Sequence, residues 1–111
     1  LARDLSGALR QRLALGCAVL HQPEVLFLDE PTSGVDPSSR ASFWTLIRLI
    51  ADSGTAVLVT THYLREAEDC DRIAFIHRGR LLEIGTPRSV RQRYGGGSLE
   101  ESFVRAMEQA A

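Results

Sequence analysis

A short apolar run that ends in two carboxylates constrains the fold of this chain more than any other feature. Residues 25–28 are apolar, and Asp29, Glu30 and Pro31 follow them directly. A brief apolar run bounded by a breaker is typical of a strand buried in a parallel sheet. Residues 56–60 repeat the pattern after a helical segment. Strand, helix and strand in this order predict an α/β fold with parallel strands.

Helical periodicity and capping residues predict the other elements. Helices are expected over residues 6–20, 37–52 and 64–70, and from residues 87 and 99 onward. Two strands, 72–77 and 80–84, are expected to form a hairpin. The expected helix caps are Asp36 and Thr86, each followed by proline, and Ser98 with Glu101. In the first helix we expect four apolar residues to face inward: Leu9, Leu13, Cys17 and Leu20.

Charge and composition exclude several classes of function. The 13 basic and 14 acidic residues leave a net charge of −1, which gives no electrostatic case for binding nucleic acid. No apolar stretch approaches the length that spans a bilayer, and the start of the chain shows no secretory signal pattern. Cys17 and Cys70 have no metal-type spacing, and a reduced cytoplasmic compartment fits them best. We expect Cys17 to be a small core residue.

The two carboxylates after the first predicted strand indicate a site. Ligands of open α/β folds bind at the carboxyl ends of the strands. Asp29 and Glu30 there would hold a cation or move protons, because buried acids are otherwise costly. The alternative is that both acids are solvated and simply follow the end of the strand.

Four segments in order carry a family resemblance: LSGALRQR (5–12), VLFLDE (25–30), SGVD (33–36) and VLVTTH (57–62). They resemble the signature motif, Walker B, D-loop and H-loop of the ATP-binding subunit of ABC transporters. The resemblance extends from Leu5 to about Phe103. It implies the fold of the C-terminal portion of a P-loop NTPase domain, with parallel strands, helices and a C-terminal hairpin, and it implies ATP and Mg²⁺ as cofactors.

The resemblance assigns roles to three residues after the strands. Asp29 would serve the Mg²⁺ shell, and Glu30 would polarise the attacking water. Because adjacent strand residues point to opposite faces, we expect these two acids to separate. His62 would hydrogen-bond the γ-phosphate, whereas a structural or solvated histidine is the alternative.

The resemblance also implies contacts across a head-to-tail dimer. Ser6, Gly7, Ala8 and Gln11 of the signature segment would bind ATP that the opposite subunit holds. Ala8 departs from the family, which usually has glycine there, and adds a methyl group where the phosphate approaches. Asp36 would touch the partner subunit, although an aspartate before a proline is also an ordinary helix cap.

The chain has no G-x-x-x-x-G-K-[ST] loop to cradle phosphates. We therefore expect it to be the C-terminal part of an ATP-binding domain, inactive alone and with uncovered apolar faces. Residues 1–94 would contain the motifs and the hairpin, and residues 95–111 a glycine linker and a C-terminal helix.

The expected function is ATP hydrolysis that energises transport across a membrane. The partners implied are a second ATP-binding subunit, identical or not, and a transmembrane transporter subunit, on the cytoplasmic face of the membrane. The segment 98–103 resembles the tail of export subunits. The alternatives are an ABC-type ATPase that acts on DNA or ribosomes without a membrane partner, and an inactive truncated product.

Overall fold

The computed structural model describes the backbone of residues 7–110 and the side chains of residues 12–110. The chain divides into two compact units, one up to Thr61 and one from His62 onward, and each is described by itself. Both units combine helices with strands, so the predicted α/β class is confirmed.

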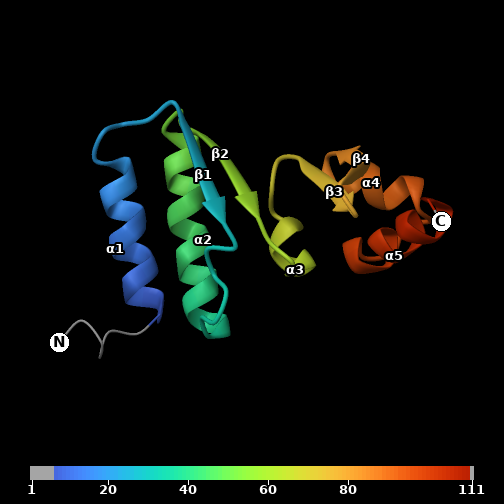
Figure 1. Cartoon of the computed structure of the whole chain (residues 1–111), viewed down its shortest axis with the longest axis horizontal. Coiled ribbons are helices and arrows are strands. Elements are labelled where there is room, and N and C mark those ends of the chain that lie inside the picture. Colours follow the sequence, from blue (N-terminus) through green and yellow to red (C-terminus); the bar gives the residue numbers. More distant parts are fainter. Residues whose placement is uncertain (1–6, 111) are drawn as a thin grey trace. The chain divides into compact units, whose positions relative to one another are not determined.

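The first unit has two helices beside two parallel strands, as Figure 1 shows. Strands β1 and β2 pair in parallel, with Leu26 opposite Val57 and Asp29 opposite Thr60. The two carboxyl ends of the strands therefore lie next to each other. In chain order the elements are α1 (Gly7–Val19), β1 (Val25–Asp29), α2 (Pro37–Asp52) and β2 (Ala56–Thr60).

The core of the first unit lies between the helices and one face of the sheet. It contains Leu15 of α1, Leu26 of β1, and Phe43 and Ile47 of α2. On the opposite face of the sheet three side chains are at least half exposed: Val25, Phe27 and Leu58. Within the first unit, therefore, only one face of these strands is covered, as expected for an uncovered apolar face.

The predicted buried face of α1 is wrong. Leu13 and Leu20 are 54% and 77% exposed, Cys17 is exposed, and Leu15 is buried instead. The side chain of Leu9 lies outside the described residues. The helix itself has apolar residues on all sides, so its sequence pattern allowed more than one buried face. Packing against α2 buries the face that contains Leu15.

The exposure of Cys17 predicts a difference in reactivity between the two cysteines. Cys17 should be modified quickly by iodoacetamide in the native chain, because its thiol is open to solvent. Cys70 should react more slowly, because it is half-buried and its Sγ donates to the Glu66 carbonyl at 3.8 Å. Peptide mass spectrometry after brief labelling of the native chain checks this, and labelling of both cysteines in the denatured chain is the reference. Faster labelling of Cys70 would contradict the corrected face of α1.

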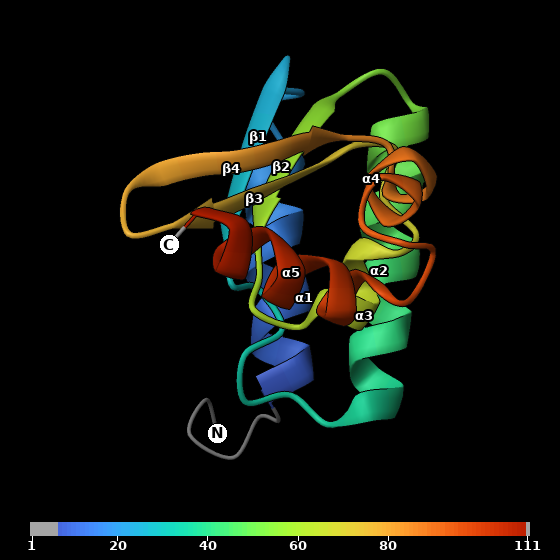
Figure 2. The ribbon, with the colours of Figure 1, turned by 90° about the vertical axis from the view of Figure 1, so that its right-hand side faces the viewer.

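The second unit is a hairpin with three helices. Figure 2 shows α5 alongside the hairpin. The hairpin turn is tight, since Arg78 and Gly79 have φ values of 51° and 74°, which suit a two-residue turn. The elements are α3 (Leu64–Ala67), β3 (Ile73–His77), β4 (Arg80–Gly85), α4 (Pro87–Arg93) and α5 (Leu99–Ala110). Helix α3 is three residues shorter than predicted.

The core of the second unit joins the hairpin to the C-terminal helix. Val90 and Leu99 are fully buried, and the rings of Phe75 and Phe103 pack edge to face with centroids 5.1 Å apart. Helix α5 contacts α3, α4 and β4. Residues before and after the predicted domain boundary, which falls between residues 94 and 95, thus share one compact unit. The predicted division into residues 1–94 and 95–111 remains a prediction.

The predicted helix caps at Thr86 and Ser98 are confirmed. The Ser89 N–H donates to Thr86 Oγ1 at 3.1 Å at the start of α4. The Glu101 N–H donates to Ser98 Oγ at 3.1 Å at the start of α5. Each cap satisfies a backbone donor that has no partner within its own helix.

Candidate functional site

One threonine hydroxyl links the two carboxylate residues at the ends of β1 and β2. The Thr60 hydroxyl donates to Asp29 Oδ1 at 2.5 Å. The same hydroxyl accepts the backbone N–H of Glu30 at 3.0 Å, and the Thr60 carbonyl accepts that N–H at 2.9 Å. Both acids are exposed. The arrangement orients the Asp29 carboxylate and fixes the backbone from which Glu30 projects.

Glu30 has an unusual backbone conformation. Its φ is 43°, in the left-handed region that a glutamate seldom adopts. Such residues cluster at functional sites, where the surrounding structure holds them. We predicted that the side chains of Asp29 and Glu30 point to opposite faces because side chains alternate along a strand, but β1 ends at Asp29. The alternation therefore does not decide where the Glu30 carboxylate points.

The turn after Glu30 is held by buried residues and backbone hydrogen bonds. Thr32 is 1% exposed and Val35 is 7% exposed. The Ser33 N–H donates to the Glu30 carbonyl and the Val35 N–H to the Thr32 carbonyl, both at 3.1 Å. The Arg40 guanidinium donates to the Val35 carbonyl at 3.3 Å. The segment between the two acids and α2 is therefore anchored along its length.

Asp36 caps helix α2. Its Oδ1 accepts the Ser39 N–H at 3.0 Å, and its Oδ2 accepts the Ser39 hydroxyl at 3.1 Å. These bonds from Ser39 lower the pKa of the Asp36 carboxyl below its ordinary value of 3.8. The capping interpretation is confirmed, and contact with a partner subunit remains a prediction.

The lowered pKa of Asp36 predicts a pH-dependent contribution to stability. A carboxyl whose pKa is lower when folded contributes fully above its unfolded value and loses that contribution as the pH falls through the folded value. Wild type should therefore melt at a higher temperature than Asp36→Asn at neutral pH, and the difference should shrink below pH 3.8. Melting followed by circular dichroism at several pH values checks this. A difference that grows on acidification would refute the charged cap.

His62 lies two residues beyond β2, at the start of the second unit. Its side chain is exposed, and its ring stacks at a tilt on Tyr63 with centroids 4.2 Å apart. Its contact with a phosphate remains a prediction.

The signature residues lie at the edge of the described region. Gly7, Ala8 and Gln11 are on α1, but only their backbone is described, and Ser6 lies wholly outside the described region. The structure therefore does not place the predicted phosphate contacts of these four residues.

The described residues contain no group of three or more histidine, cysteine and acidic side chains that could enclose a metal ion. Mg²⁺ does not need such a cage, because it usually keeps several waters and binds one or two carboxylates. The exposed Asp29 carboxylate, oriented by Thr60, fits that mode of binding.

Sequence reasoning missed Thr60 as a site residue. It appeared only as the last residue of a strand, yet its hydroxyl contacts both Asp29 and Glu30. The signal was available in the pairing of the strands, since a hydroxyl residue at the end of β2 falls opposite Asp29. Thr60 can be recognised as a site residue only when the pairing register of β1 and β2 is known, and the sequence alone does not determine that register.

Comparisons with known proteins identify a matching family model and a solved structure with the same fold. A family model described as "AAA domain, putative AbiEii toxin, Type IV TA system" matches residues 3–64. A solved structure titled "Structure of ATP binding subunit of ABC transporter" superposes with a TM-score of 0.79 at 30% identity, over 95% of this chain and 45% of that one.

Curated relatives carry related names. The chain is 44% identical over 106 residues, 91% of its length, to the "Probable multidrug ABC transporter ATP-binding protein YbhF" of Escherichia coli. It is 43% identical over 100 residues, 89% of its length, to the "Daunorubicin/doxorubicin resistance ATP-binding protein DrrA" of Streptomyces peucetius. It is 37% identical over 106 residues, 95% of its length, to the "Linearmycin resistance ATP-binding protein LnrL" of Bacillus subtilis. The chain spans 18%, 30% and 34% of these relatives.

The fold and the family match define the class as an AAA-type, P-loop ATPase domain. Within that class, the chain belongs to the family of ABC transporter ATP-binding proteins, and it matches a part of their length. No helix among residues 7–110 is both long enough and apolar enough to cross a bilayer.

Proposed function

We propose that this chain supplies the hydrolytic part of an ATP site that drives transport across a membrane. The observation that carries the proposal is the hydrogen-bonded set of Asp29, Thr60 and Glu30 at the carboxyl ends of two parallel strands. Ligands of open α/β folds bind at this edge. There the Thr60 hydroxyl orients the Asp29 carboxylate, which would support the metal, and bonds the backbone N–H of Glu30, the second acid.

The two acids have different tasks in this proposal. Asp29 supports Mg²⁺ through its water shell, and the metal neutralises charge on the phosphates when bound. Glu30 accepts a hydrogen bond from the attacking water and orients it towards the γ-phosphate. The left-handed backbone of Glu30, held by Thr60, fixes the base of that side chain before ATP arrives.

The remaining predicted residues complete the proposed site. His62 hydrogen-bonds the γ-phosphate. Ser6, Gly7, Ala8 and Gln11 contact ATP held by a second ATP-binding subunit. Because a composite site of this kind needs two subunits, the proposal includes a head-to-tail dimer whose second subunit touches Asp36.

Transport is favoured over an action on DNA or ribosomes by the names of the relatives. All three described above are ATP-binding proteins, one of a multidrug ABC transporter and two of drug resistance. The near-neutral charge of the chain agrees with that choice. The partner proposed is a transmembrane exporter subunit, and the location proposed is the cytoplasmic face of the membrane.

A chimeric protein tests the proposal. In this chimera, the segment of Streptomyces peucetius DrrA that matches over 100 residues is replaced by the corresponding residues of this chain. We expect it to bind ATP in the presence of Mg²⁺ in calorimetry, and we expect Asp29→Asn to weaken the Mg²⁺-dependent part. Equal binding by the chimera and Asp29→Asn at every Mg²⁺ concentration would remove Asp29 from the metal site.

A further inference from the structure

Helix α3 is a single turn that begins two residues after His62. It comprises Leu64–Ala67, and no side chain caps its start at Tyr63. One isolated helical turn is unstable in water, because nucleation costs more than the few hydrogen bonds return. Contacts with the rest of the second unit must therefore hold α3 in place.

Part of this support is apolar. Ala67 is buried in a cluster with Val90 of α4 and with Leu99 and Ala106 of α5. Leu64 packs against the same cluster. Helix α5, the last element of the chain, thus forms the surface on which α3 rests.

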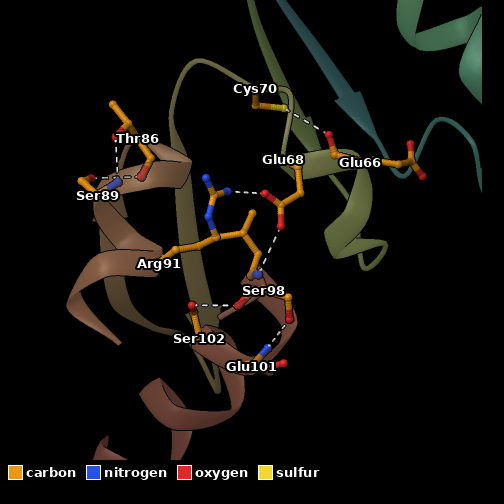
Figure 3. A network of polar contacts seen from close by, with 10 residues as sticks. Glu66, Glu68, Cys70, Thr86, Ser89, Arg91, Ser98, Glu101 and Ser102 are labelled. Carbon is orange, nitrogen blue, oxygen red and sulfur yellow. Dashed lines mark hydrogen bonds and ion pairs between the residues drawn. The ribbon is translucent and has the colours of Figure 1, made fainter. Parts of the chain in front are cut away.

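The other part is one carboxylate at the end of α3. Glu68 Oε2 forms an ion pair with the Arg91 guanidinium of α4, and Glu68 Oε1 accepts the Leu99 backbone N–H at 3.2 Å (Figure 3). Leu99 is the first residue of α5, so its N–H has no acceptor within that helix. A carboxylate at a helix N-terminus is also favoured by the helix dipole. Glu68 therefore joins α3 to both α4 and α5.

The start of α3 is connected to His62. The Tyr63 carbonyl accepts the Glu66 N–H at 3.0 Å, so the backbone of Tyr63 is tied to the helix. The rings of Tyr63 and His62 stack with centroids 4.2 Å apart. A displacement of α3 would therefore move Tyr63, and with it the ring of His62.

We infer that Glu68 is a positioning residue for His62, acting through α3 with the C-terminal helix as its support. The inference rests on the proposed function, in which His62 contacts the γ-phosphate. It gives α5 a role in the ATP site without any contact with nucleotide. A carboxylate that lies outside the four motifs would thereby set the geometry of a motif residue.

Nuclear magnetic resonance of the full 111-residue chain tests the inference. The chain has three histidines, so their Hε1 signals can be assigned with single His→Gln variants. Glu68→Gln preserves the shape of the side chain and removes its charge. We expect the His62 signal to shift and broaden, while the His21 signal in the first unit stays where it is.

Glu83→Gln is the matched control. Glu83 forms an ion pair with Arg93 between β4 and α4, so the variant removes a similar interaction within the same unit. Its described partners, Arg93, Tyr94 and Ile84, lie outside α3, and we expect the His62 signal to stay unchanged. Arg91→Gln is a second test that leaves Leu99 N–H bonded to Glu68, and we expect a smaller shift of His62 than with Glu68→Gln.

Two results would overturn the inference. One is an unmoved His62 signal in Glu68→Gln, provided that the amide spectrum shows a folded chain. The other is an equal shift of His62 in Glu68→Gln and Glu83→Gln, which would reflect general loosening of the unit. If Glu68→Gln does not fold, an unmoved His62 signal in folded Arg91→Gln overturns it.

Kinetics of the chimera provide a second readout. Glu68→Gln should lower kcat for ATP about tenfold or more and leave KM unchanged, because a misplaced group costs rate at the chemical step. An unchanged kcat would count against the inference. A chimera without any hydrolysis would instead contradict the proposed function, and the magnetic resonance test would stand independently of it.

Discussion

Replacement of Glu30 by glutamine should stop ATP hydrolysis by the chimera while ATP binding persists. Glutamine preserves the size of the side chain but orients and activates water poorly, so we expect kcat to fall by about 10²–10⁴-fold. The Thr60 hydroxyl and carbonyl accept the backbone N–H of Glu30, which the substitution retains, so we expect the local turn to survive. Phosphate release measures turnover, and calorimetry measures ATP affinity.

Glu24→Gln is the matched control for this substitution. Glu24 is exposed and precedes β1, at the end of the strand opposite to Asp29. Glu24→Gln removes the same charge as Glu30→Gln, but Glu24 lies at the other end of β1 from the proposed site, so we expect ATP turnover to be unchanged. Undiminished turnover in Glu30→Gln would remove Glu30 from its proposed role.

Phe43→Ala should cause the largest loss of stability in the first unit. Phe43 is 2% exposed and lies in the cluster with Leu15, Leu26 and Ile47. Truncation of a buried phenylalanine costs about 3–5 kcal/mol, because it removes apolar contacts and leaves a cavity. Domains of this size are stable by only about 5–15 kcal/mol. Urea unfolding followed by fluorescence of Trp44, the single tryptophan, reports on this cluster.

Leu49→Ala on the same helix is the control for Phe43→Ala. Leu49 is 60% exposed, so its truncation should change the free energy of unfolding by no more than about 0.5 kcal/mol. Similar losses in the two variants would mean that the cluster beneath α2 is not the core of the unit.

Much of the fold was predictable because its signals are local. Caps at Asp36, Thr86 and Ser98, and apolar runs bounded by breakers, fixed the elements to within a few residues. The orientation of α1 was not predictable, because apolar residues lie all around it and only contact with α2 selects Leu15. Burial of this kind depends on partners distant in sequence.

The candidate site was predicted only in part, because some of its signals are local and others depend on residues distant in sequence. Asp29 and Glu30 are adjacent to a strong strand signal, and the structure places them at the end of β1. The link through Thr60 depends on strand register, and the left-handed φ of Glu30 depends on the hydrogen bonds around it. Neither can be read from residue types. The support of α3 likewise depends on a hydrogen bond between Glu68 and Leu99, which are 31 positions apart in the sequence.

The most direct test of the central claim is Mg²⁺-dependent ATP turnover by the chimera that contains the unaltered residues of this chain. We expect turnover comparable to that of Streptomyces peucetius DrrA measured alongside it, with dependence on Glu30. A folded chimera that binds ATP but releases no phosphate would contradict the claim that this chain supplies a working hydrolytic site.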